Sequence, residues 1–266
     1  MITLGLQEKA LIGLFLALPA LVLAAYGVRV AVAGRALDPR VQRESSTVLL
    51  GRFPIEAFHW VLRGVGRAVS RSGVSPDALT LISLVISGAS LPLAALGLLP
   101  AAGAALLFGA AFDALDGIVA RERGVASDAG EVLDAVVDRY ADAAPLLGLA
   151  IYFRDSVPVL LLVLAALMGS MLVSYVRAKS EAMSLSLPGG LMRRHERIAY
   201  LTVGLLVGPL WPEAQLAGVT LTAPLMLLAV GVVAVVSNIA AVQLTRAARV
   251  ALVELGRGPQ ARGPRA

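Results

Sequence analysis

The sequence predicts an all-α, polytopic membrane helix bundle. Of its 266 residues, 58% are hydrophobic and 15% charged, whereas a soluble domain carries about 25% charged residues. Several apolar runs reach about 20 residues, the length a helix needs to cross a bilayer. The absence of cysteine excludes a secreted disulfide scaffold. We attribute the net charge of +5 to residues that orient helices and contact anionic headgroups, not to nucleic-acid binding.

Seven runs are expected to span the membrane. The first could be mistaken for a signal peptide, but its apolar stretch is too long, and a retained anchor is expected. With the N-terminus outside, every arginine-rich connection falls on one side, as the positive-inside rule requires. A multi-pass protein of the cytoplasmic (inner) membrane is therefore expected. The runs cover residues 10–34, 77–98, 101–121, 128–152, 157–180, 194–212 and 221–246.

An amphipathic helix is expected between the first two spans. Arg63, Arg67 and Arg71 recur every four residues and form a polar stripe opposite an apolar side. This pattern is typical of a helix that lies on the cytoplasmic leaflet, and a soluble linker helix is the alternative. Ser75 and Pro76 are expected to cap the second span. The predicted organisation is an anchor and linker over 1–41, an interfacial segment over 42–74, a six-helix membrane domain over 75–250 and a basic flexible tail over 251–266.

Aspartates cluster in the third and fourth expected spans. Carboxylates are costly inside a membrane, so each is a candidate functional residue. One helical face of the third span carries Asp113, Asp116, Gly117 and Ala120. One face of the fourth carries Ser127, Gly130, Asp134 and Asp138. Because both faces begin near the same connection, the hairpin can turn four carboxylates toward each other.

The carboxylate cluster predicts a metal site. Four aspartates cannot all stay ionised at low dielectric without compensation. Oxygen ligands suit Mg²⁺ or Mn²⁺ rather than zinc, and the only histidines, His59 and His195, lie outside both spans. The small residues Gly117, Ala120 and Gly130 leave room for a ligand beside the metals. Close helix packing is the alternative explanation for them.

The two faces together contain a string that resembles the signature of the CDP-alcohol phosphotransferases, namely Asp113-x-x-Asp116-Gly117-x-x-Ala120-Arg121, eight residues, Gly130-x-x-x-Asp134-x-x-x-Asp138. The resemblance covers roughly residues 75–246, and the first span lies outside it. One departure precedes the first core helix, where the family's Pro-Asn is Pro76-Asp77.

The resemblance implies a catalytic membrane domain that transfers a phosphatidyl group from CDP-diacylglycerol to an alcohol and releases CMP. It implies two divalent cations, Mg²⁺ or Mn²⁺. The arginine distribution predicts that this active site faces the cytoplasm. The implied metal ligands are Asp113, Asp116, Asp134 and Asp138. The implied nucleotide-binding residues are Asp113, Gly117, Ala120, Arg121, Ser127 and Gly130. Asp138 is also the implied catalytic base. Family members are often dimers, which makes a homodimer a candidate assembly.

The expected acceptor is a phosphorylated polyol, inositol phosphate. Ser174 and Arg177 lie at i, i+3 on the fifth span, and Arg197 approaches from the same cytoplasmic side. An arginine fork suits a phosphate monoester. The segment resembles the acceptor pocket of phosphatidylinositol-phosphate synthases, with Arg177 in place of a lysine. We attribute Arg193 and Arg194 to the positive-inside rule alone.

Other acceptors and one other class of protein remain open. The same chemistry could use glycerol 3-phosphate, serine, or a diacylglycerol that receives a head group. Buried aspartates could instead form the pathway of an ion or proton transporter, but they gather at one end and no internal repeat is visible. Asp142, one turn beyond Asp138, either pairs with Arg139 or joins a hydrogen-bond network.

Overall fold

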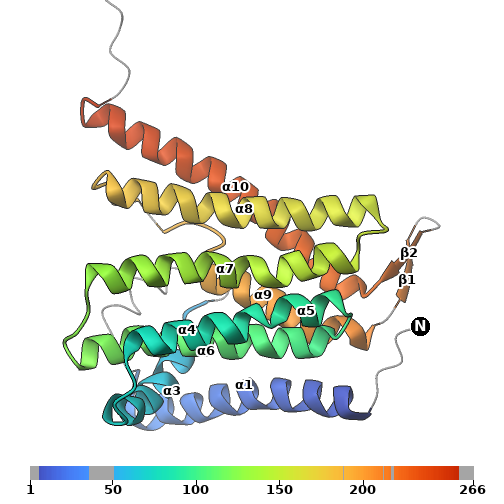
Figure 1. Ribbon diagram of the computed structural model, residues 1–266, viewed down its shortest axis with the longest axis horizontal. Helices are drawn as coiled ribbons and strands as arrows, with labels where there is room; N and C mark the ends of the chain where they lie inside the picture. Colours follow the sequence, from blue (N-terminus) through green and yellow to red (C-terminus); the bar gives the residue numbers. More distant parts are fainter. Residues whose placement is uncertain (1–5, 36–50, 188, 212, 217–218, 258–266) are drawn as a thin grey trace, which may run out of the picture.

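The computed structural model describes residues 6–35, 51–187, 189–211, 213–216 and 219–257. Its long helices lie side by side, which confirms the polytopic all-α prediction (Figure 1). In chain order the elements are α1 (Leu6–Ala33), α3 (Arg52–Arg71), α4 (Pro76–Gly88), α5 (Ser90–Ala95), α6 (Leu99–Glu122), α7 (Asp128–Tyr152), α8 (Val157–Ala182), α9 (Arg194–Val207), the 3₁₀ turn η1 (Gly208–Leu210), β1 (Glu213–Leu216), β2 (Val219–Thr222) and α10 (Pro224–Glu254).

Five helical segments are long and apolar enough to cross a membrane. They are Ile12–Ala33, Pro76–Ala95, Leu99–Glu122, Val157–Ala182 and Pro224–Glu254. The second combines α4 and α5, which are separated only at Ala89. The helices α7 and α9 are not among the five. The helix α7 carries several aspartates of the predicted site, and α9 has only 14 residues. Membrane crossing by these two helices stays a prediction.

Two expected spans differ from the observed elements. The run over 194–212 is the short helix α9 followed by η1, and an antiparallel hairpin of β1 and β2 follows that the sequence did not predict. The last span was expected over 221–246, but α10 continues to Glu254 and enters the segment assigned to the flexible tail. The helix ends just before Gly256, the first glycine or proline in the segment assigned to the tail. With a φ of 70°, Gly256 has the left-handed conformation that commonly follows the end of a helix.

The bundle packs in pairs around a buried apolar core. The helix α8 lies along α10, α4 lies against α6 and α7, and α9 lies between α6 and α10. The core includes Leu146, Val163, Leu205 and Met226, from four different helices. At the start of α4, the Ser75 hydroxyl accepts a hydrogen bond from the Ala78 amide at 3.2 Å, with proline in the first turn, so the predicted cap is confirmed.

The helix α3 runs across the ends of α1 and α6 instead of along them (Figure 1). Its buried side places Leu62 against Leu115 and Ile118 of α6, while Arg67 and Arg71 are exposed. This amphipathic arrangement is the one expected of an interfacial helix. The interfacial segment was predicted from residue 42, but residues 36–50 lie outside the described part of the chain.

Candidate active site

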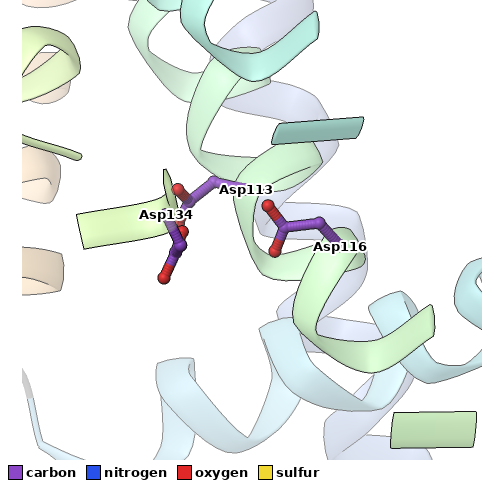
Figure 2. A group of neighbouring side chains, drawn as sticks. All are labelled: Asp113, Asp116 and Asp134. Atoms are coloured by element: carbon purple, nitrogen blue, oxygen red, sulfur yellow. The ribbon is translucent and has the colours of Figure 1, made fainter. Parts of the chain in front are cut away.

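Three aspartates form the centre of the site. One carboxylate oxygen from each of Asp113, Asp116 and Asp134 lies within 4.8 Å of the others (Figure 2). Asp116 is buried, and Thr80 of α4 donates a hydrogen bond of 2.5 Å to its Oδ2. The buried Oδ1 of Asp113 has no hydrogen-bond partner among the described residues. Three oxygen donors and one unpartnered buried oxygen fit a hard divalent cation.

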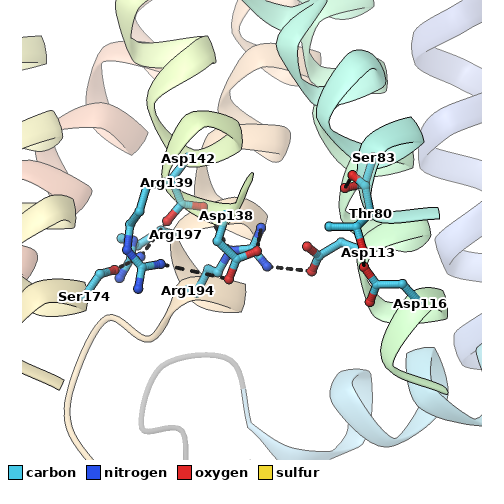
Figure 3. Close-up of polar contacts among 10 residues, drawn as sticks. All are labelled: Thr80, Ser83, Asp113, Asp116, Asp138, Arg139, Asp142, Ser174, Arg194 and Arg197. Atoms are coloured by element: carbon cyan, nitrogen blue, oxygen red, sulfur yellow. Dashed lines mark hydrogen bonds and ion pairs between the residues drawn. The ribbon is translucent and has the colours of Figure 1, made fainter. Parts of the chain in front are cut away.

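Arg194 connects this group to two further aspartates (Figure 3). Its Nη1 lies 2.6 Å from Asp113 Oδ2, its Nη2 lies 2.8 Å from Asp138 Oδ1, and its Nε lies 3.1 Å from Asp142 Oδ1. Glu196, fully buried, accepts a hydrogen bond of 2.9 Å from the Arg193 amide and so caps α9. The cap places Arg194 at the first helical position, beside the aspartates. Its attribution to the positive-inside rule alone was wrong.

Asp142 belongs to a buried ion-pair network. Its Oδ2 accepts a hydrogen bond of 2.8 Å from Arg197, which also donates to the Ser174 hydroxyl at 3.0 Å. All three side chains are buried, and Arg197 is only 2% exposed. The network alternative for Asp142 is therefore the observed one. Arg139 lies instead 3.9 Å from Asp138.

The predicted metal and acceptor residues occupy different surroundings. Asp138 stands outside the three-carboxylate cluster and is bridged to it through Arg194. Ser174 and Arg197 are bonded to each other inside the protein. Arg177 lies elsewhere, on a cavity of about 410 Å³ at the end of α8, and its buried Nε and Nη2 have no hydrogen-bond partner among the described residues. The other lining residues are Ser180, Glu181, Ser184, Leu185, Ser186 and Leu187.

The predicted nucleotide-binding residues gather around the turn between α6 and α7. The Arg121 guanidinium lies 3.0 Å from where a Cβ on Gly117 would be, so a larger residue would displace it. Ala120 precedes it by one residue. Ser127 caps α7 by accepting a hydrogen bond of 3.2 Å from the Gly130 amide. Asp77, the departure from the family pattern, lies next to Gly130: its Oδ1 is 3.8 Å from where a Cβ on Gly130 would be.

Two features of the site were not predictable from the signature. Thr80 lies 36 residues before Asp116, and only the packing of α4 on α6 brings its hydroxyl there. Arg194 follows the connection after α8, whose path no local pattern gives. Arg197, which was predicted as an acceptor-binding residue, lies only three residues further along the chain.

Comparison with known proteins gives the same family as the motif. A model of the family described as CDP-alcohol phosphatidyltransferase matches residues 73–245. The phosphatidylinositol phosphate synthase of Mycobacterium bovis is 36% identical over 176 residues, covering 63% of this chain and 81% of that protein. The synthase of Corynebacterium glutamicum is 36% identical over 164 residues, covering 59% and 73%.

Solved structures agree in fold. The phosphatidylinositol phosphate synthase of Mycobacterium tuberculosis, in a crystal structure with CDP-DAG bound, matches at 30% identity with a TM-score of 0.62, over 77% of this chain and 98% of that chain. The same protein in complex with manganese and citrate matches with a TM-score of 0.61, over 77% and 93%. The matched family segment contains both aspartate helices. With three of its four signature aspartates gathered at one point of a matching bundle, this chain belongs to the CDP-alcohol phosphatidyltransferase family, whose members are membrane enzymes of phospholipid biosynthesis.

Proposed function

We propose that the protein transfers the phosphatidyl group of CDP-diacylglycerol to a hydroxyl of inositol phosphate and releases CMP. The observation that carries the proposal is the convergence of Asp113, Asp116 and Asp134 on one point, with Asp138 joined to them through Arg194. The M. bovis and C. glutamicum relatives are named phosphatidylinositol phosphate synthases, and one solved relative holds CDP-DAG.

Two divalent cations, Mg²⁺ or Mn²⁺, are the proposed cofactors. Asp113, Asp116 and Asp134 would hold them, and Asp138 would complete the set. When bound, the cations would neutralise the pyrophosphate and stabilise the charge that develops on the departing CMP. Support comes from the oxygen cluster in this chain and from the manganese complex of the M. tuberculosis enzyme.

Asp138 is the proposed base. In the reaction, the acceptor hydroxyl oxygen forms a bond to the phosphorus that carries diacylglycerol, and the bond from that phosphorus to CMP breaks. The hydroxyl proton moves to the Asp138 carboxylate. Its side chain is 15% exposed, and Arg194 holds its Oδ1 at 2.8 Å, so the carboxylate is oriented toward the cluster yet reachable.

The turn between α6 and α7 is the proposed CMP site. Gly117 and Gly130 leave space beside the backbone, and the Arg121 guanidinium lies over Gly117, where it would meet a phosphate of the nucleotide. Asp113, Ala120 and Ser127 complete the predicted set, with Ser127 acting mainly through the cap it forms on α7. The cytidine ring and the phosphates would lie against these small residues.

Arg177 and Arg194 are the residues best suited to the acceptor phosphate. Arg177 lines a cavity of about 410 Å³, and its buried Nε and Nη2 have no hydrogen-bond partner among the described residues. Arg194 stands between Asp113 and Asp138, where the acceptor hydroxyl must arrive. Ser174 and Arg197 would hold the acceptor side indirectly, through their bonds to each other and to Asp142.

An acceptor competition tests the proposal against its alternatives. Purified protein would receive CDP-diacylglycerol, Mn²⁺ and equal concentrations of inositol phosphate, glycerol 3-phosphate and serine, with lipid products identified by mass spectrometry. We expect the inositol phosphate product to dominate, and Arg177→Gln to raise the KM for inositol phosphate about tenfold. Arg154→Gln, an exposed control, should change nothing. Consumption of serine alone would contradict the phosphate-recognition argument.

The cellular arrangement is part of the proposal. The active site would face the cytoplasm in the inner membrane, because the arginine-rich connections lie at the aspartate end of the bundle. The division into an anchor and linker over 1–41, an interfacial segment over 42–74, a catalytic domain over 75–250 and a tail over 251–266 is proposed as well, with α10 extending past the last boundary. A homodimer is the proposed assembly.

A further inference from the structure

The helix α3 is fixed to the aspartate helix α6 by an unusually close contact. A Cβ on Gly66 of α3 would come within 2.5 Å of the Ile118 side chain, so only glycine allows this approach. Leu62 packs beside it against Leu115 and Ile118, the residues that flank Asp116 and Gly117. The helix α3 therefore packs on one side of the turn of α6 that carries Asp116 and Gly117 on its other side. We call this packing position the seat of α3.

A second attachment runs from the active-site turn to the C-terminal end of α3. Arg123 follows α6 directly, and its Nε and Nη2 donate to the carbonyl oxygen of Ser70 at 2.9 and 2.5 Å. Its Nη1 donates to the carbonyl oxygen of Val74 at 2.7 Å. A helix end leaves carbonyl groups without helical partners. The guanidinium of Arg123 satisfies the Ser70 carbonyl at the end of α3 and the Val74 carbonyl just beyond it with charge-assisted hydrogen bonds.

The turn that carries Arg123 is closed by a backbone hydrogen bond of its own. Gly124 has a φ of 67°, and the Val125 amide donates to the Ala120 carbonyl at 3.0 Å, the hydrogen bond that closes a helix C-terminus. A displacement of α3 at Arg123 therefore moves the turn as a unit. That unit includes Ala120 and Arg121 on one side and leads into the Ser127 cap on the other.

We propose that Arg123 is a positioning residue that makes the geometry of the CMP site depend on the seat of α3. The inference rests on the proposed function for the CMP-side residues alone, not on the identity of the acceptor. Without the attachment, α3 and the turn move independently, and the arrangement competent to bind CDP-diacylglycerol is less populated. Apparent affinity falls in proportion to that population. Loss of each charge-assisted hydrogen bond shifts such an equilibrium by about tenfold. Because Arg123 makes three of them, their joint loss turns the attached arrangement into the minor one, and the apparent affinity falls with it.

Two variants with matched controls test the inference. Arg123→Gln removes the attachment, with exposed Arg154→Gln as its control. Gly66→Ala pushes α3 away from Ile118, whereas Gly64→Ala, in the same helix, meets no atom within 4 Å. We expect the KM for CDP-diacylglycerol to rise about tenfold in both test variants, with kcat within about twofold of the parent. Arg123→Lys, which keeps a cationic donor, should recover part of the affinity. A loss confined to kcat, as from an unstable protein, would overturn the proposal.

A structural readout separates this inference from the proposed function. The chain has no cysteine, so spin labels at Ser72→Cys and Asp128→Cys report the distance between the end of α3 and the start of α7. The distance distribution should be narrow in the parent and in both controls, and broad in Arg123→Gln and Gly66→Ala. Unchanged distributions would overturn the proposal even in a protein that uses CDP-diacylglycerol. Broadening in a protein that does not release CMP would uphold the attachment and reject the proposed function.

Discussion

Replacing Asp142 by asparagine should destabilise the protein, because it removes the carboxylate from a buried ion-pair network. Asp142 is the carboxylate partner of Arg197, at 2.8 Å, and Arg197 is 2% exposed. Asparagine has nearly the same shape but no charge. Arg194 would keep its contacts to Asp113 and Asp138. Arg197 would keep the neutral partners that the structure shows for it, the Ser174 hydroxyl and the Met192 carbonyl.

The size of the effect follows from the burial of this pair. Removing one member of a buried ion pair costs about 3–5 kcal/mol, because the other charge is left without compensation. At about 2–4 °C per kcal/mol for a chain of this size, the expected fall in melting temperature is about 6–20 °C. An exposed pair is worth at most about 1 kcal/mol. Asp155, 91% exposed and 3.9 Å from Arg154, provides the matched comparison.

The assay is thermal unfolding of the purified protein in detergent, followed by intrinsic tryptophan fluorescence and by retention of the monodisperse peak. Asp142→Asn should unfold at least about 6 °C below the parent, and Asp155→Asn within about 2 °C of it. The double variant Asp142→Asn with Arg197→Gln should be less destabilised than the sum of the single variants, because they remove the same interaction. Equal melting temperatures for Asp142→Asn and Asp155→Asn would refute the reasoning.

Three further predictions concern the site and its orientation. Asp138→Asn should lose turnover while retaining CDP-lipid binding, and a loss of binding as large as that of Asp134→Asn would contradict its role as base. Arg194→Gln should bind Mn²⁺ about three- to tenfold more tightly in a spin-resonance titration, because the guanidinium that competes for Asp113 is removed. Its kcat should fall, and weaker Mn²⁺ binding would count against this prediction. A cysteine at exposed Val125 should be labelled from the cytoplasmic side and one at exposed Asp155 from the opposite side; labelling of both from one side would break the topology.

The predictable parts of the fold are those set by local pattern. Apolar runs gave the long helices, since each needs about 20 residues to cross a bilayer, and Ser75 with Pro76 gave the start of α4. The hairpin after η1 was missed because its eight strand residues lie between two apolar runs and resemble their ends. The extension of α10 was missed because Arg246 and Arg249 suggested the end of a span, whereas a helix can leave the membrane without ending.

In the site, too, the features set by local pattern could be predicted and the others could not. The aspartate spacings are local, and helical geometry turns them to one face, so the meeting of Asp113, Asp116 and Asp134 could be predicted. Contacts that join distant segments could not. Thr80 reaches Asp116 through packing of α4 on α6, and Arg194 reaches Asp138 through the path of the chain after α8. In the sequence Arg194 is one of many arginines on the cytoplasmic side, and only its surroundings distinguish it.

The most direct test of the central claim is CMP release from CDP-diacylglycerol by the purified protein, measured with and without Mn²⁺. The account predicts release that requires Mn²⁺ and the acceptor, and that Asp116→Asn abolishes together with Mn²⁺ binding, while the fold survives because Thr80 can still hydrogen-bond the asparagine. Mn²⁺-independent release, or full activity in Asp116→Asn, would contradict it.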